Sequence, residues 1–256
     1  MKNFIQILGS GSSLGTPWIS NQWGNLNKNN KKNFRTRCSA FIQYKKLSIL
    51  IDTSPDIKKQ VLDNNIRTID AVLFTHEHAD QTSGIFEIRP FTWHPKKKIK
   101  MYGSKKTIKI LSDKYDYIFK KKKGFAPIGK SYTIKNKFLI SNGTSKLNFN
   151  CFEVDHGQTT STAYVFKKIA YISDCKNINF KDFKYLKDLN FLIIDCLKFK
   201  SNSKHFTFEE SIEFAKKIKA KKTVLTNLSI DLEYNYLKKH TPKNIYPAYD
   251  GMKLNF

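Results

Sequence analysis

The sequence predicts an α/β fold in which two β-sheets pack against each other and helices cover their outer faces. Two observations carry this prediction. Short apolar runs that read as strands are mixed with amphipathic helical segments in both halves of the 256-residue chain, which is typical of sheets covered by helices. No internal repeat and no Pro-, Gly- or Ser-rich linker divides the chain, so we expect one domain over residues 1–256.

The first half of the chain is expected to consist mainly of strands. These strands are predicted at 3–8, 38–44, 47–52 and 70–75. An amphipathic helix is expected near 55–64, with Pro55 at its start, where proline is favoured. The last of the strands leads directly into His76, so polar groups emerge at a strand end.

The second half repeats this alternation. Strands are predicted near 146–155, 162–166, 169–173, 190–194 and 222–226. Helices are predicted at about 180–188, 207–219 and 231–239. Thr207 followed by Glu210 is a capping-box pattern, which marks the start of the helix from residue 208.

Composition and charge favour a cytoplasmic protein with a lysine-rich surface. The net charge is +25, but arginine occurs only four times among 46 basic residues, which leaves 42 lysines. Lysines are spread along the chain, with one run at Lys120 to Lys123, and this indicates compositional bias more than a surface built to grip phosphates. No segment approaches the roughly 20 apolar residues of a membrane span. No secretory signal opens the chain, and four widely separated cysteines indicate reduced, buried thiols.

The segment at 75–81 reads THEHADQ and is the strongest functional signal. It follows an apolar strand, so its side chains emerge at the end of that strand. His76 and His78 stand two residues apart, and Asp80 follows two residues later. Imidazole nitrogens and carboxylate oxygens are zinc ligands, and this spacing lets them converge on one side of a tight loop.

Two later segments have the same design. The predicted strand at 150–156 ends in His156, and the one at 170–174 ends in Asp174. Strand ends that carry metal-ligating residues in this order resemble the metallo-β-lactamase superfamily. The segments GSGSSLGTP at 9–17, RTRCS at 35–39, IDT at 51–53 and YDGM at 249–252 resemble the branch that contains phosphoribosyl 1,2-cyclic phosphate phosphodiesterase.

The resemblance runs essentially from end to end and implies a four-layer αβ/βα sandwich with a metal cleft at the strand ends. It implies that His76, His78 and His156 hold a first metal and that Asp174 bridges to a second. Asp80 and the residues at positions 81 and 227 would complete the second site. It also implies a catalytic role for His205.

The chain departs from the family at two of these positions. Gln81 and Asn227 stand where the family has histidine, and both departures fall on the second site. We therefore expect Zn²⁺ in the first site. The second site is expected to be empty, or to take a hard ion such as Mn²⁺ or Mg²⁺ on oxygen donors from Asp80, Gln81, Asp174 and Asn227.

The resulting hypothesis is a metal-dependent hydrolase, a phosphodiesterase that attacks a small or cyclic phosphodiester through a zinc-bound hydroxide. Asp80 would orient the water or accept its proton, and His205 would protonate the leaving oxygen. Arg35 and Arg37 are candidate phosphate clamps because bidentate geometry would explain arginine in a lysine-biased chain. The glycine-rich loop around Ser12 would bind phosphate through backbone N–H groups.

Two other functions stay open at this stage. One is an RNA-processing endonuclease of the same superfamily, for which the basic surface would be the footprint. The other is a non-catalytic metal-binding relative whose second site has decayed. The expected partner is a small phosphodiester, with nucleic acid as the less favoured candidate, no membrane, and a homodimer as an open alternative.

Overall fold

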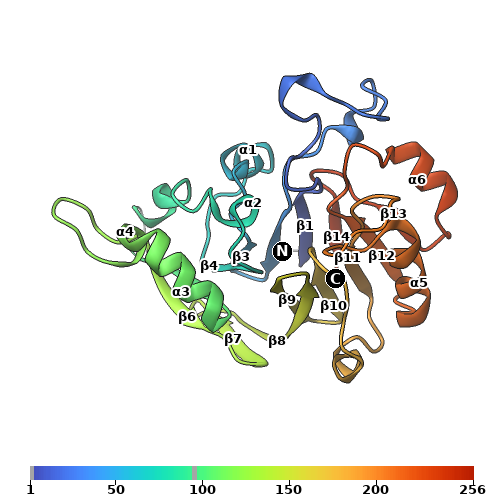
Figure 1. Cartoon of the computed structure of the whole chain (residues 1–256). Helices are drawn as coiled ribbons and strands as arrows, with labels where there is room; N and C mark the ends of the chain where they lie inside the picture. The colour runs from blue at the N-terminus through green and yellow to red at the C-terminus, as the bar shows by residue number, and fades with distance from the viewer. Residues whose placement is uncertain (1–2, 94–96) are drawn as a thin grey trace.

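Two seven-stranded sheets lie at the centre of the computed structural model, which describes residues 3–93 and 97–256 (Figure 1). Helices lie on the outer side of each sheet. His94, for which the sequence indicates a surface position, lies outside the described residues.

The first sheet contains mostly strands from the first half of the chain. In spatial order its strands are β14 (Lys253–Asn255), β1 (Phe4–Gly9), β2 (Ser39–Tyr44), β3 (Leu47–Ile51), β4 (Ala71–Leu73), β5 (Ile99–Gly103) and β6 (Gly129–Thr133). The pairs from β3 to β6 are parallel. The loops that follow these strands therefore leave the sheet at one edge.

The second sheet comes from the second half. In spatial order its strands are β13 (Ile245–Pro247), β12 (Lys222–Thr226), β11 (Phe191–Asp195), β10 (Ile169–Ile172), β9 (Thr159–Phe166), β8 (Lys146–His156) and β7 (Lys137–Ser141). β10 to β13 are parallel, whereas β7, β8 and β9 form an antiparallel meander. This arrangement places the ends of β8 and β10 beside the edge that β4 reaches.

The helices divide between the two outer faces. They are α1 (Ile57–Asp63), α2 (Ala79–Thr82), α3 (Lys105–Lys114), α4 (Asp116–Phe119), α5 (Phe208–Ile218) and α6 (Tyr234–His240). The first four lie on the side of the first sheet, and α5 and α6 lie on the side of the second (Figure 1). Short 3₁₀ turns occupy Ile19–Asn21, Lys31–Asn33, Arg89–Thr92 and Phe180–Tyr185.

Three apolar layers separate the four structural layers. The middle one packs Ile42 and Leu73 of the first sheet against Tyr164 and Ile193 of the second. A second layer lies between the second sheet and α5, and a third lies between the first sheet and helices α1 and α3. Successive residues of most strands point to opposite faces of the sheet, and apolar side chains are buried on both faces. This confirms the predicted four-layer sandwich.

Most predicted elements exist, with boundaries shifted by one to three residues. The capping box at Thr207 is confirmed, because its hydroxyl accepts the Glu210 N–H and the Glu210 carboxylate accepts the Thr207 N–H. The predicted helix at 180–188 is a 3₁₀ turn over Phe180–Tyr185. The helices α3 and α4 and the strands β5 to β7 were not predicted; the three strands have only five residues each and each contains a lysine.

The helices were compared with what a membrane span requires. Over the described residues, none combines the length and the hydropathy that crossing a bilayer requires.

Candidate metal centre

His76 and His78 lie in the loop that joins β4 to α2. β4 is three residues long and pairs in parallel with both neighbours, so the loop leaves the sheet at the carboxyl edge of β4. His76 is fully buried, and His78 is half-buried immediately before α2 begins. The short strand and the immediate helix hold the two imidazoles on one tight turn.

His156 and Asp174 reach the same place from the second sheet. His156 is the last residue of β8, and Asp174 follows β10 by two residues. Both are buried, at 2% and 3% exposure. The two sheets therefore contribute two candidate ligands each to one site at their shared edge.

Three imidazole nitrogens converge there. His76 Nε2 lies 2.9 Å from His78 Nδ1, and His156 Nε2 lies 3.3 Å from the same nitrogen. The edge of a zinc tetrahedron with bonds of 2.0–2.1 Å is about 3.3 Å. The three nitrogens are therefore positioned to hold a divalent ion, and ligand atoms of all three lie within 4.8 Å of one another.

Hydrogen bonds on the far side of two rings fix which nitrogen faces the site. His156 Nδ1 donates to the Lys204 carbonyl at 2.9 Å, which leaves Nε2 as the free base. His76 Nδ1 lies 3.1 Å from the Thr75 hydroxyl, which in turn donates to Asp52 at 2.8 Å. Partners of this kind orient metal-binding imidazoles and raise their basicity.

Burial keeps the inner imidazoles neutral, which is the form that binds metal. It lowers the pKa of His76 to about 4, and it also lowers the pKa of His78, with the nearby His156 acting in the same direction. Neutral rings with their lone pairs turned inward are the donor set that a zinc ion requires.

His205 faces this cluster from the loop before α5. With His156 and Asp174 it forms a second group of side chains close enough to share an ion. His205 Nδ1 lies 2.8 Å from Asp195 Oδ2 and 3.9 Å from Asp174 Oδ1. Burial alone would lower the pKa of His205, but the Asp195 charge and hydrogen bond raise it to about 9. A protonated imidazole is therefore available beside the site.

Sequence reasoning missed Asp195 and Asp52, which act through the residues it identified. Both are completely buried acids at or just after the end of a strand. Their sequence signal was an Asp that ends an apolar run, the same signal that identified Asp174.

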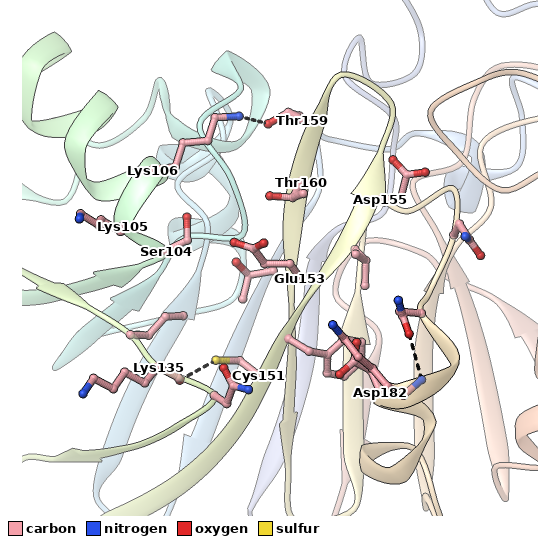
Figure 2. Close-up of a pocket in the computed structure, with 18 of the residues that line it drawn as sticks. Ser104, Lys105, Lys106, Lys135, Cys151, Glu153, Asp155, Thr159, Thr160 and Asp182 are labelled. Carbon is pink, nitrogen blue, oxygen red and sulfur yellow. Dashed lines mark hydrogen bonds between the residues drawn. The ribbon is translucent and has the colours of Figure 1, made fainter.

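Glu77, between the two histidines, was also missed, and it points away from the site. Its carboxylate accepts from the Thr159 hydroxyl at 2.9 Å and pairs with Lys106 at 2.9 Å. Burial would raise the pKa of Glu77, but these two partners lower it. Lys106 also donates to Thr159 at one rim of a groove of about 900 Å³ that also contains Glu153 (Figure 2). The histidine loop is thus tied to α3 and to the β8–β9 hairpin.

The remaining expected ligands lie on the other side of Asp174. Asp80 and Gln81 are in the short helix α2, and Asn227 follows β12. The side-chain amides of Gln81 and Asn227 contact the carboxylate of Asp174 at 3.3 and 3.4 Å. All the expected metal ligands are therefore brought together around Asp174 and the three imidazoles.

Arg35 does not have the environment of a phosphate clamp. Its side chain is 1% exposed, and its guanidinium donates to the Ser229 and Leu232 carbonyls and to Asn33. Burial lowers its pKa to about 10, so it stays charged at neutral pH. The expectation from sequence is corrected here, because the guanidinium fork tethers the 229–232 loop.

We expect Arg35→Met to lower the free energy of unfolding by about 2–4 kcal/mol, because it leaves buried carbonyl oxygens without donors. Arg37→Met is the matched control and should cost about 1 kcal/mol or less, since its partner is at a half-exposed position. Urea unfolding of both variants measures the difference. Equal losses would show that Arg35 has no special structural role.

Arg37 and the loop around Ser12 are also engaged within the protein. The Arg37 guanidinium makes a two-pronged contact with Asp56, at 2.8 and 2.6 Å. The N–H of Ser12 donates to the Leu228 carbonyl, and those of Ser10 and Gly11 donate to Asp250 and Thr36. The expectation that these N–H groups bind phosphate is therefore not supported by their contacts.

The chain is similar to known proteins in both sequence and structure. A family model described as a beta-lactamase superfamily domain matches residues 48–226, a span that contains His76, His78, His156, Asp174 and His205. Among curated proteins, the chain is 29% identical over 252 residues to an octanoyltransferase of Porphyromonas gingivalis. The match covers 96% of this chain but only 50% of that protein, so the chain spans half the length of that relative.

Solved structures agree with the family match. The chain is similar to a diphosphatase of the PhnP family, with 30% identity, a TM-score of 0.89 and coverage of 100% of this chain and 98% of that one. Zn²⁺-bound PqqB of Methylobacterium extorquens has 18% identity and a TM-score of 0.76, with coverage of 99% and 100%. The short form of human tRNase Z has 17% identity and a TM-score of 0.68, with coverage of 98% of each chain. The last two likenesses show the fold alone.

Proposed function

Because this chain belongs to the beta-lactamase superfamily, whose members are mostly hydrolases, we propose that it is a metal-dependent phosphodiesterase acting on a small, including cyclic, phosphodiester. The whole chain, residues 1–256, would act as one hydrolase domain. The observation that carries the proposal is the convergence of three imidazoles beside His205, whose Nδ1 lies 2.8 Å from Asp195. The full-length similarity to a PhnP-family diphosphatase supports a phosphorus-centred reaction.

In this proposal His76, His78 and His156, with Asp174, hold a zinc ion. Zinc on such ligands supplies Lewis acidity, which makes water a competent nucleophile at neutral pH. The donor set fits, because three ring nitrogens converge on one point and burial lowers the pKa of His76 to about 4.

The chain's own residues would carry the proton transfers. Asp80 and Asp174 both contact the Gln81 amide, and the Asp80 carboxylate would orient the attacking water. His205 would donate its Nε2 proton to the leaving oxygen, since Nδ1 is engaged with Asp195. A general acid of this kind typically contributes 10²–10⁴-fold to the rate. Asp195 is then a positioning residue that keeps the imidazole protonated and oriented.

RNA is the second candidate substrate, because Lys120 to Lys123 form an exposed basic run between α4 and β6. Binding to a polyanion weakens steeply as salt rises from about 50 to 200 mM, whereas binding of a small diester does not. We expect the chain to hydrolyse small phosphodiesters with kcat/KM that changes little over this range. Replacing the four lysines with glutamine should leave that turnover unchanged.

The measurement is a hydrolysis assay on aryl and ribose-cyclic phosphodiesters beside a structured RNA, at both salt concentrations. Turnover of RNA alone, falling with salt and with loss of the lysine run, would replace the small-molecule proposal. Binding of metal without turnover of either substrate would leave a non-catalytic metal protein.

We do not propose acyl transfer for this chain, although one relative is an octanoyltransferase. That name belongs to a protein twice as long. All four cysteines here are buried, and burial raises the pKa of each thiol. None of them therefore offers the thiolate that a cysteine-based transfer needs.

A further inference from the structure

We propose that Gln81 and Asn227 take the place of a second metal ion, using their amide N–H groups to hold Asp174 where an ion would otherwise bridge it. The inference rests on the metal centre of the proposed function and adds that this centre takes one ion only. It replaces the expectation that the two amides offer oxygen donors to a hard ion.

The direction of the Asn227 amide is fixed by its neighbours. The side chain is 1% exposed, and Nδ2 lies 3.0 Å from Asp195 Oδ1 and 3.4 Å from Asp174 Oδ1. Nδ2 also lies 3.2 Å from His205 Nδ1, which is engaged with Asp195 Oδ2. Because ionised carboxylates only accept hydrogen bonds, the two acid contacts favour the nitrogen at this position. Turning the amide to offer its oxygen to an ion would place that oxygen 3.0 Å from Asp195, with no proton between them.

Gln81 lies between two acids in the same way. It is fully buried, and its Nε2 is 3.3 Å from both Asp80 Oδ2 and Asp174 Oδ2. Its Oε1 has no hydrogen-bond partner among the described residues. The amide NH₂ therefore lies between the two carboxylates, and its N–H groups face both of them.

Together the two amides satisfy both oxygens of Asp174, with Asn227 at Oδ1 and Gln81 at Oδ2. A second ion would have to displace the contacts of Gln81 and Asn227 with Asp174. The two displaced N–H donors would then remain close to the ion in a buried space. Removing donors from buried acceptors is unfavourable, because the acceptors lose hydrogen bonds that water cannot replace. The amides thus offset the repulsion among Asp80, Asp174 and Asp195 without a second dication.

The test is metal stoichiometry, measured without reference to activity. Chelator-treated protein is titrated with Zn²⁺ and separately with Mn²⁺ by calorimetry, and bound metal per chain is counted by mass spectrometry after gel filtration. We expect one tightly bound zinc in the wild type and two in the variant that combines Gln81→His with Asn227→His. Each single variant should stay close to one, because one imidazole leaves the second site half built.

The variants are compatible with the backbone. Asn227 has φ of 65°, a left-handed conformation that histidine tolerates better than most residues. Asn29→His is the control, because it adds an imidazole at an exposed loop position. Gln81→Glu is a second probe that keeps the volume and exchanges the N–H₂ for an oxygen. It should gain a second Mn²⁺.

A wild type that binds two ions as tightly as the double variant would overturn the inference, as would a folded double variant that stays at one zinc. If the double variant does not fold, Gln81→Glu decides: a second Mn²⁺ supports the inference, and none overturns it. One ion bound without phosphodiester turnover would refute the proposed function alone. Two ions with turnover would refute this inference alone.

Discussion

Replacing His156 with alanine is expected to remove the bound metal and reduce phosphodiester hydrolysis to background. His156 Nε2 is one of the three converging nitrogens, and its ring is fixed through the Lys204 carbonyl. Without it, two imidazoles from a single loop and Asp174 remain, so the site keeps two of its three converging nitrogens and would bind zinc much more weakly. Metal per chain and kcat/KM are measured on the same preparation.

His240→Ala is the matched control for this experiment. His240 is an exposed imidazole at the end of α6, bonded to the Tyr236 carbonyl. Its loss should leave both metal and activity unchanged. A His156 variant that keeps a full equivalent of metal would show that the cluster does not bind it.

Replacing His205 with alanine should reduce activity without removing the metal. The metal should stay, because the three imidazoles are intact, while kcat should fall by ~10²–10⁴-fold through loss of the general acid. KM should change little if His205 acts on the leaving oxygen rather than on substrate binding. Loss of metal from this variant would make His205 a ligand instead.

The pH profile tests how Asp195 acts on His205. A general acid works only when protonated, so kcat should fall as the pH rises through the pKa of His205, which Asp195 raises to about 9. A cation in the site would lower that pKa, so the informative quantity is the difference between proteins. Asp195→Asn removes the raising charge and should move the alkaline limb to lower pH. An unmoved limb with reduced kcat would indicate a purely structural role.

Most residues of the candidate metal centre could be predicted from the sequence, because they lie at the ends of strands. His76, His156 and Asp174 each close such a run, and strand ends at one edge of a sheet meet in space. The strands themselves were predictable where they are buried on both faces. β6 and β7 were not, because lysine and serine at exposed positions hide any apolar alternation.

The direction in which a polar side chain points could not be predicted from the sequence. Arg35 stands in a motif that resembles a phosphate site, yet its guanidinium turns inward to carbonyls from residues 229 and 232. Gln81 and Asn227 each carry one donor and one acceptor group, and only the placement of Asp174 and Asp195 decides which faces the site. These contacts join residues more than thirty positions apart, and local pattern does not report them.

The division of candidate ligands between the two sheets would make a bound metal ion a cross-link. His76 and His78 belong to the first sheet, while His156 and Asp174 belong to the second, and Glu77 already ties the same loop to the β8–β9 hairpin through Thr159. An ion bound by both halves stabilises only the docked arrangement, so its binding free energy adds to the cohesion of the sandwich. If the proposed metal binds there, metal supply would affect how firmly the two halves of this chain stay together, and folding would be linked to metal binding.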